Sequence, residues 1–151
     1  MNLPKIKNHL FDREYMSGLE REKHRIKTTG EVFTPTVLVE DGLDKINQKV
    51  FKDSTKTFLD PSCGDGQFLA SVLYRKLENG IDFETALSTI YGVDLMKDNV
   101  ELCRERLLCG REDLRHIVER NVIVHDCLIY DYSFNGTNKT DAELAFDTLF
   151  D

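Results

Sequence analysis

Residues 58–70 have the sequence Phe58-Leu59-Asp60-Pro61-Ser62-Cys63-Gly64-Asp65-Gly66-Gln67-Phe68-Leu69-Ala70. The apolar and β-branched residues 57–59 predict a short buried strand that ends at Asp60. Gly64 and Gly66 permit a tight turn and a close approach of the backbone to a ligand. Apolar residues then recur at helical spacing over 69–77. The segment therefore predicts a strand, a glycine turn and a helix, and in a parallel α/β sheet such a turn is where ligands bind.

The glycine pattern restricts the chemistry of that ligand. A dinucleotide fingerprint requires Gly-x-Gly-x-x-Gly, but Leu69 occupies the third glycine position. The phosphate loop is also missing, because Gly66 is followed by Gln67 and not by lysine and a hydroxyl residue. Asp60 and Asp65 flank the turn, and two carboxylates repel a phosphate but suit a ligand with an ammonium or sulfonium cation. The pattern favours S-adenosylmethionine, which carries both cations.

Three motifs resemble those of one enzyme family. Residues 60–68 resemble the first motif of S-adenosylmethionine-dependent DNA adenine methyltransferases, Asp-Pro-x-Cys-Gly-x-Gly-x-Phe, and match it at every fixed position. Residues 29–35 (Thr29-Gly30-Glu31-Val32-Phe33-Thr34-Pro35) resemble the Gly-x-x-Phe/Tyr-Thr-Pro motif of the members that modify N6 of adenine. Residues 90–95 (Ile90-Tyr91-Gly92-Val93-Asp94-Leu95) resemble the second-strand motif, which ends in an acid. The motifs occur in the order found in the family.

Aspartates are predicted at the ends of three successive strands. Asp94 follows an apolar strand 34 positions after Asp60, which leaves room for one crossover helix and brings both acids to the same edge of a parallel sheet. A third predicted strand, 121–125, ends at Asp126. The resemblance assigns Asp94 to the ribose hydroxyls of the cofactor, Leu95 to its adenine ring and Asp126 to its adenine amino group.

The cofactor site that these motifs imply consists of Thr29, Phe33, Thr34, Pro35, Asp60, Pro61, Cys63, Gly64, Gly66, Phe68, Asp94, Leu95, Asp126 and Cys127. Simpler interpretations exist for individual residues, because a single aspartate after a strand often caps a turn, and Thr34-Pro35 is typical of a helix start. The four cysteines show neither a Cys-x-x-Cys pair nor a histidine at zinc spacing, so we expect reduced thiols and no metal site.

The motif that would perform the chemistry is not found. Adenine methyltransferases of this kind carry Asn/Asp-Pro-Pro-aromatic after a fourth strand, where it holds the extruded target base. The prolines here are Pro4, Pro35 and Pro61, so no Pro-Pro pair occurs. The resemblance covers about residues 26–130, the cofactor half of the catalytic domain. It implies an S-adenosylmethionine-dependent methyltransferase of restriction-modification type, inactive as this chain alone. The alternatives are a noncatalytic S-adenosylmethionine-binding regulatory or interaction module, and an enzyme that methylates another target with different residues.

Composition sets expectations for partners and location. With 40% hydrophobic and 31% charged residues the chain is typical of a globular protein, and it has neither an apolar run of membrane-spanning length nor a secretion signal. We therefore expect a cytoplasmic protein. The net charge of −7 is unusual for DNA binding, so contact with DNA would require a separate recognition region. We expect a basic helical leader over residues 1–27 and an S-adenosylmethionine-binding domain over residues 28–151.

The predicted fold is a doubly wound, Rossmann-like α/β domain with three or four mostly parallel strands and helices on both faces. An incomplete sheet of this kind leaves an edge for a second copy or a complementing subunit. The predicted helices span 35–50, with an apolar face of Val37, Leu38, Leu43 and Ile46, and 66–79, 82–88, 96–109 and 111–119. The predicted strands are 56–60, 90–94 and 121–125, followed by a surface loop at 131–140.

Overall fold

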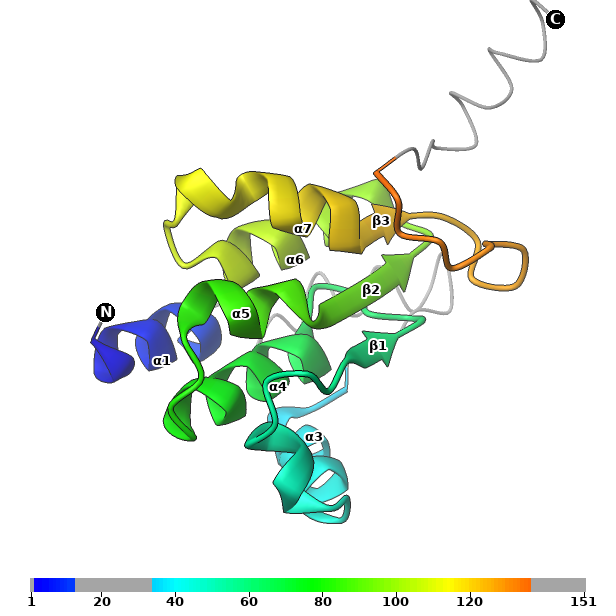
Figure 1. Ribbon diagram of the computed structural model, residues 1–151. Helices are drawn as coiled ribbons and strands as arrows, with labels where there is room; N and C mark the ends of the chain where they lie inside the picture. Colours follow the sequence, from blue (N-terminus) through cyan, green and yellow to red (C-terminus); the bar gives the residue numbers. More distant parts are fainter. Residues whose placement is uncertain (1, 13–33, 137–151) are drawn as a thin grey trace, which may run out of the picture.

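The computed structural model describes residues 2–12 and 34–136 (Figure 1). Its helices are α1 (Leu3–Phe11), α3 (Thr36–Asp44), α4 (Gln67–Glu78), α5 (Phe83–Ser88), α6 (Lys97–Leu108) and α7 (Arg115–Asn121). Short 3-10 helices occur at η2 (Gln48–Phe51) and η3 (Glu112–Leu114). The strands are β1 (Phe58–Asp60), β2 (Ile90–Asp94) and β3 (Val122–Val124).

The strands form one parallel sheet in the order β1-β2-β3. Asp60 pairs with Gly92 and Asp94 pairs with Val124, so the carboxyl ends of all three strands lie at the same edge of the sheet. The predicted fold class is confirmed: the chain is α/β, with a three-stranded parallel sheet flanked by helices, as in a truncated Rossmann-like methyltransferase domain.

The two faces of the sheet are covered differently. Parallel crossovers are almost always right-handed, and here both advance in the same direction, so α4 and α6 lie on the same face. On the other face Val93 and Ile123 pack against Tyr130, with Cys127 and Phe134 beside it. Within the described residues, this face is therefore covered by the segment 127–134 where we expected helices.

The N-terminal helix α1 belongs to the main core. Ile6 and Leu10 are buried in the same cluster as the apolar residues of α4 and α6. Ile6 and Leu10 are one turn apart, which gives the helix a single apolar stripe. The first part of the predicted leader thus packs against the domain, whereas residues 13–27 lie outside the described residues and the division at residue 27 stays a prediction.

The helix predicted over 35–50 is shorter than expected and turns a partly different face inward. It ends as α3 at Asp44 and is followed by η2. Of the predicted apolar face, Leu43 is confirmed as buried, whereas Val37 and Leu38 are wrong at 78% and 58% exposed, and Ile46 is 41% exposed. The second buried residue of α3 is Val39. Val39 and Leu43 are one helical turn apart, and α3 packs against α4 along that stripe.

The helix predicted over 111–119 is divided into η3 and α7, and α7 begins only at Arg115. Most other differences are shifts of one or two residues. β1 begins at Phe58, two positions later than predicted, and Pro35, not Thr34, is the N-cap of α3. Such shifts are usual at element ends. No helix of the described part is long and apolar enough to cross a membrane.

Candidate functional site

The glycine turn between β1 and α4 has the conformation that its sequence predicts. Gly64 and Gly66 have φ of 54° and 95°, in the left-handed region that favours glycine. The Cys63 amide donates to the Val93 carbonyl at 2.9 Å, and the Gly66 amide donates to the Cys63 carbonyl at 2.9 Å. The turn is therefore tied to β2 as well as to β1.

Asp94 at the end of β2 also holds the turn. Its Oδ1 accepts from the Gly64 amide at 3.2 Å, and its Oδ2 accepts from the Met96 amide at 3.0 Å and from Asn99 Nδ2 at 3.3 Å. A carboxylate has about four acceptor positions, so about one position on Oδ1 is left for a ligand. Sequence reasoning missed Asn99, which is fully buried on α6.

Asp60 lies at the adjacent strand end in a protected position. Its Oδ1 accepts from the Ser62 amide at 3.0 Å. Burial raises the pKa of the Asp60 carboxyl and the Asp94 charge raises it further, while the hydrogen bond from Ser62 opposes both effects. Ionisation of Asp60 therefore costs more in the folded protein than in the unfolded chain, and a cation bound beside the carboxylate would relieve that cost.

A small pocket of about 80 Å³ opens at the turn. Thr34, which precedes α3, lines the pocket with Asp60, the turn residues Gly64 and Asp65, and Phe68 of α4. A larger hollow of about 700 Å³ lies between α1, α3 and α4, away from the strand ends. Size alone does not identify the site, because the smaller pocket is the one that lies at the end of β1 and the glycine turn, with Asp60 in its lining.

The larger hollow contains charges that are already paired. The Arg75 guanidinium donates to Glu40 Oε2 and to Asp44 Oδ1, both at 2.7 Å, and Arg75 also lies over the ring of Phe51. Within the part of the chain that the structure describes, no group of three histidine, cysteine or acidic residues could hold a metal ion.

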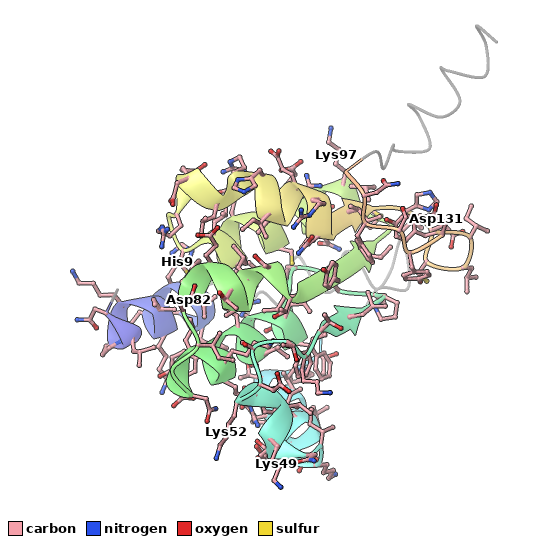
Figure 2. All side chains as sticks on the ribbon, in the orientation of Figure 1. His9, Lys49, Lys52, Asp82, Lys97 and Asp131 are labelled. Atoms are coloured by element: carbon pink, nitrogen blue, oxygen red, sulfur yellow. The ribbon has the colours of Figure 1, made fainter. Side chains whose placement is uncertain are left out.

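The end of β3 completes the edge of the sheet. The His125 amide donates to the Asp94 carbonyl at 3.0 Å, which brings Asp126 close to the end of β2. Asp126 Oδ1 accepts from the Leu128 amide at 2.9 Å, so this carboxylate also caps a turn. Leu95 is 62% exposed and available to a ligand. Figure 2 shows Asp131 on the same side of the molecule as these strand ends, opposite Asp82 at the start of α5.

Not every residue of the predicted site faces this edge. Cys63 lines the small pocket, but its side chain is otherwise buried, and the Cys103 side chain and burial raise the pKa of its thiol. Pro61 and Pro35 are exposed, and the Cys127 carbonyl accepts from the Tyr132 hydroxyl at 2.6 Å. Thr29 and Phe33 lie outside the described residues.

The parallel sheet, the glycine turn and the acidic strand ends are those of a Rossmann-like domain of the methyltransferase class. The chain matches the family model for N-6 DNA methylase over residues 7–143 and belongs to that family. No curated protein and no solved structure matches it.

Proposed function

We propose that this chain binds S-adenosylmethionine at the carboxyl ends of β1, β2 and β3 and is the cofactor-binding part of a DNA adenine-N6 methyltransferase. The observation that carries this proposal is the group of Asp60, Asp94 and Asp126 around a turn with two left-handed glycines, in a chain of the N-6 DNA methylase family. Members of that family generally use S-adenosylmethionine.

The residues at the turn fit the chemistry of this cofactor. Asp60 offers negative charge beside the small pocket, which suits the ammonium and sulfonium groups of the methionine moiety. Asp94 retains an acceptor position for a ribose hydroxyl, and the exposed Leu95 offers an apolar surface for adenine. The Asp126 carboxylate is the acceptor for the adenine amino group. The bound cofactor would supply an activated methyl group.

We further propose that methyl transfer needs residues that these 151 residues do not contain. An adenine must leave the base stack and be held beside the methyl donor, and the Asn-Pro-Pro-aromatic segment that does this in the resembling enzymes is not encoded here. A radiolabel transfer assay on adenine-containing duplexes, with this chain alone, should give no signal above a Gly64→Val control. Reproducible methylation above that control would mean that the active site lies elsewhere in the chain.

The partners follow from the same proposal. In the described sheet β1 is an edge strand, Leu59 is 48% exposed, and an apolar groove of about 260 Å³ runs beside it. Such an edge suits a complementing subunit or a second copy, and DNA contact would come from a separate recognition region. Light scattering that shows a strict monomer at high concentration would contradict self-association. We place the protein in the cytoplasm, in a restriction-modification role, with a noncatalytic S-adenosylmethionine-binding module as the alternative.

Mapping the bound cofactor tests the proposed site. On titration with S-adenosylmethionine, amide resonances of Gly64, Leu95 and Asp126 should shift. The amides of Lys76 and Thr89, whose side chains meet at the opposite end of the sheet, should stay in place. Shifts confined to the hollow between α1, α3 and α4 would contradict the proposal.

A further inference from the structure

Arg106 on α6 is a charged side chain with no exposure to solvent. Removing a guanidinium from water is costly unless its donors are bonded to acceptors inside the protein. Among the described residues, three groups receive or face this guanidinium, and they belong to two parts of the chain that are far apart in the sequence.

The first group is the C-terminal end of α1. Arg106 Nε donates to the Leu10 carbonyl at 2.6 Å. Carbonyls in the last turn of a helix have no partner within the helix and lie at the negative end of its dipole, so a buried guanidinium is well suited to cap them. The same two helices meet again at His9 Nε2, which lies 3.2 Å from the Glu105 carbonyl; His9 is labelled in Figure 2.

The other two groups belong to the glycine turn and the start of α4. Arg106 Nη2 donates to Gln67 Oε1 at 3.3 Å, and Arg106 Nη1 lies 3.8 Å from Asp65 Oδ1. Asp65 is buried and stands between Gly64 and Gly66. Asp65 and Gln67 both line the small pocket at the strand ends.

We infer that Arg106 is a positioning residue that couples the docking of α1 to the conformation of the glycine turn. Among the described residues α1 contributes none to the lining of the small pocket, yet it sets the affinity for S-adenosylmethionine through this guanidinium. This effect on affinity rests on the proposed function, whereas the coupling itself is a property of the protein without ligand.

The physical reason lies in the buried carboxylate of the turn. Without the Arg106 guanidinium the Asp65 carboxylate loses a neighbouring buried cation, and the cost of keeping its charge away from water favours its movement toward water. Asp65 is joined directly to Gly64 and Gly66, so that movement changes the φ angles that shape the turn. Loosening α1 removes the Leu10 carbonyl from Arg106. The guanidinium then loses an acceptor that holds it in place beside Asp65.

Hydrogen exchange of the full chain without ligand tests the coupling at both ends. Arg106→Met removes the guanidinium, and its control is Arg104→Met on the same helix, whose guanidinium donates to the Val122 carbonyl at 2.8 Å. Ile6→Ala loosens α1, and its control is Ile117→Ala on α7; both isoleucines are 3% exposed in the same core. Relative to its control, each variant should exchange the Gly66 amide about tenfold faster, the effect expected when a hydrogen bond to a charged group is lost.

The affinity for S-adenosylmethionine, measured by calorimetry, should also fall about tenfold in Arg106→Met relative to Arg104→Met. Equal Gly66 exchange in Ile6→Ala and Ile117→Ala would overturn the inference, and this pair decides it if Arg106→Met does not fold. Unchanged affinity in folded Arg106→Met would overturn it as well. If the wild-type chain does not bind S-adenosylmethionine at all, the proposed function fails, while the exchange comparison still decides whether Arg106 couples α1 to the turn.

Discussion

Asp94 has two backbone partners before any ligand arrives, in addition to the Asn99 side chain. Its carboxylate receives the Gly64 amide of the turn and the Met96 amide that follows β2. Asp126 receives one backbone amide, that of Leu128, and does not contact the turn through a described hydrogen bond. Loss of Asp94 should therefore affect both the ligand contact and the shape of the turn, whereas loss of Asp126 should affect one ligand contact.

We predict that Asp94→Ala weakens S-adenosylmethionine binding more than Asp126→Ala does. A hydrogen bond to a charged group contributes about 1.5–3 kcal/mol, so Asp94→Ala should lower the affinity at least about tenfold. Calorimetric titration measures both affinities, and far-UV circular dichroism shows that each variant is folded. Equal affinities for the wild type and folded Asp94→Ala would remove Asp94 from the site.

The pKa of Asp60 predicts a pH dependence of stability. Burial and the Asp94 charge raise this pKa above its ordinary value of 3.8, so the folded protein holds the proton more tightly than the unfolded chain. The resulting cost appears as the pH rises from below 3.8 through the folded-state pKa, and it is fully present above it. Asp60→Asn should therefore be more stable than the wild type at pH 7, and the difference should vanish below about pH 4.

A second aspartate provides the control for Asp60→Asn. Asp53 Oδ1 accepts from the Thr55 amide at 2.9 Å, in the same local geometry as Asp60 with Ser62, but Asp53 is exposed and the Thr55 hydrogen bonds lower its pKa. Asp53→Asn should therefore be less stable than the wild type at pH 7, and this difference should disappear as the pH falls through the folded-state pKa of Asp53. Urea unfolding at several pH values measures both, and a destabilised Asp60→Asn at pH 7 would show that burial does not govern this carboxyl.

We predict that Gly66→Ala lowers the free energy of unfolding more than Gly80→Ala does. Both glycines have φ near 90°, at 95° and 85°, so a side chain costs about 1–2 kcal/mol at either position. A Cβ at Gly66 would lie 2.8 Å from Cys103 Sγ, whereas a Cβ at Gly80 would have no neighbour within 4 Å. The additional loss in Gly66→Ala should shrink in a Cys103→Ala background. Equal losses of unfolding free energy for the two variants in urea would mean that Cys103 of α6 does not restrict the space at Gly66.

Sequence reasoning located some of these side chains and missed others for a physical reason. Gly64 and Gly66 are recognisable because their conformation is a local property of the turn. Arg106 is not, because its partners lie 96 positions away at Leu10 and 39 positions away at Gln67. Nothing in the local pattern distinguishes it from Arg104 on the same helix.

At the scale of elements, α4 packs on β2 with a large residue on the helix, Leu69, against a glycine on the strand, Gly92. Leu69 stands where a dinucleotide fingerprint has its third glycine, and the small residue is on the strand instead. A Cβ at Gly92 would lie 2.8 Å from Leu69 Cδ1 and 3.0 Å from Cys63 Sγ. Helix and strand therefore approach closely although the helix carries a large side chain.

This packing predicts opposite effects for two glycine substitutions. Gly92→Ala should destabilise the protein by about 1–3 kcal/mol, because it overpacks the contact between α4 and β2. Gly42→Ala on α3 should raise the free energy of unfolding by about 0.5–1 kcal/mol, because alanine is favoured within a helix. Its Cβ would lie 3.8 Å from the Phe68 ring, which is an ordinary van der Waals contact. Urea unfolding measures both. In Gly92→Ala, adding Leu69→Ala should cost less than Leu69→Ala costs in the wild type, and full additivity of the two substitutions would contradict the proposed contact.

Element types were easier to predict than the faces they bury. The strand predicted over 90–94 and the helix predicted over 82–88 agree with β2 and α5 to within one residue. The buried face of α3 was predicted correctly only at Leu43. Val37 and Leu38 are as apolar as Val39, and only the position of α4 decides which of these residues is covered.

At the scale of the whole molecule, the order of the motifs was sufficient to predict a parallel sheet with its acidic strand ends at one edge. The sequence did not show that both crossovers advance in the same direction, which leaves one face of the described sheet to the segment 127–134. It also did not show that α1 enters the main core, because Ile6 and Leu10 form too short a pattern to identify the surface that they meet.

Calorimetric titration of the wild-type chain with S-adenosylmethionine and, separately, with NAD decides which ligand the strand ends bind. Three acidic strand ends, a turn without the third glycine and a pocket lined by Asp60 favour a cationic ligand over a pyrophosphate. We predict saturable binding of S-adenosylmethionine and no binding of NAD under the same conditions. Binding of NAD, or no binding of S-adenosylmethionine by folded protein, would contradict this prediction.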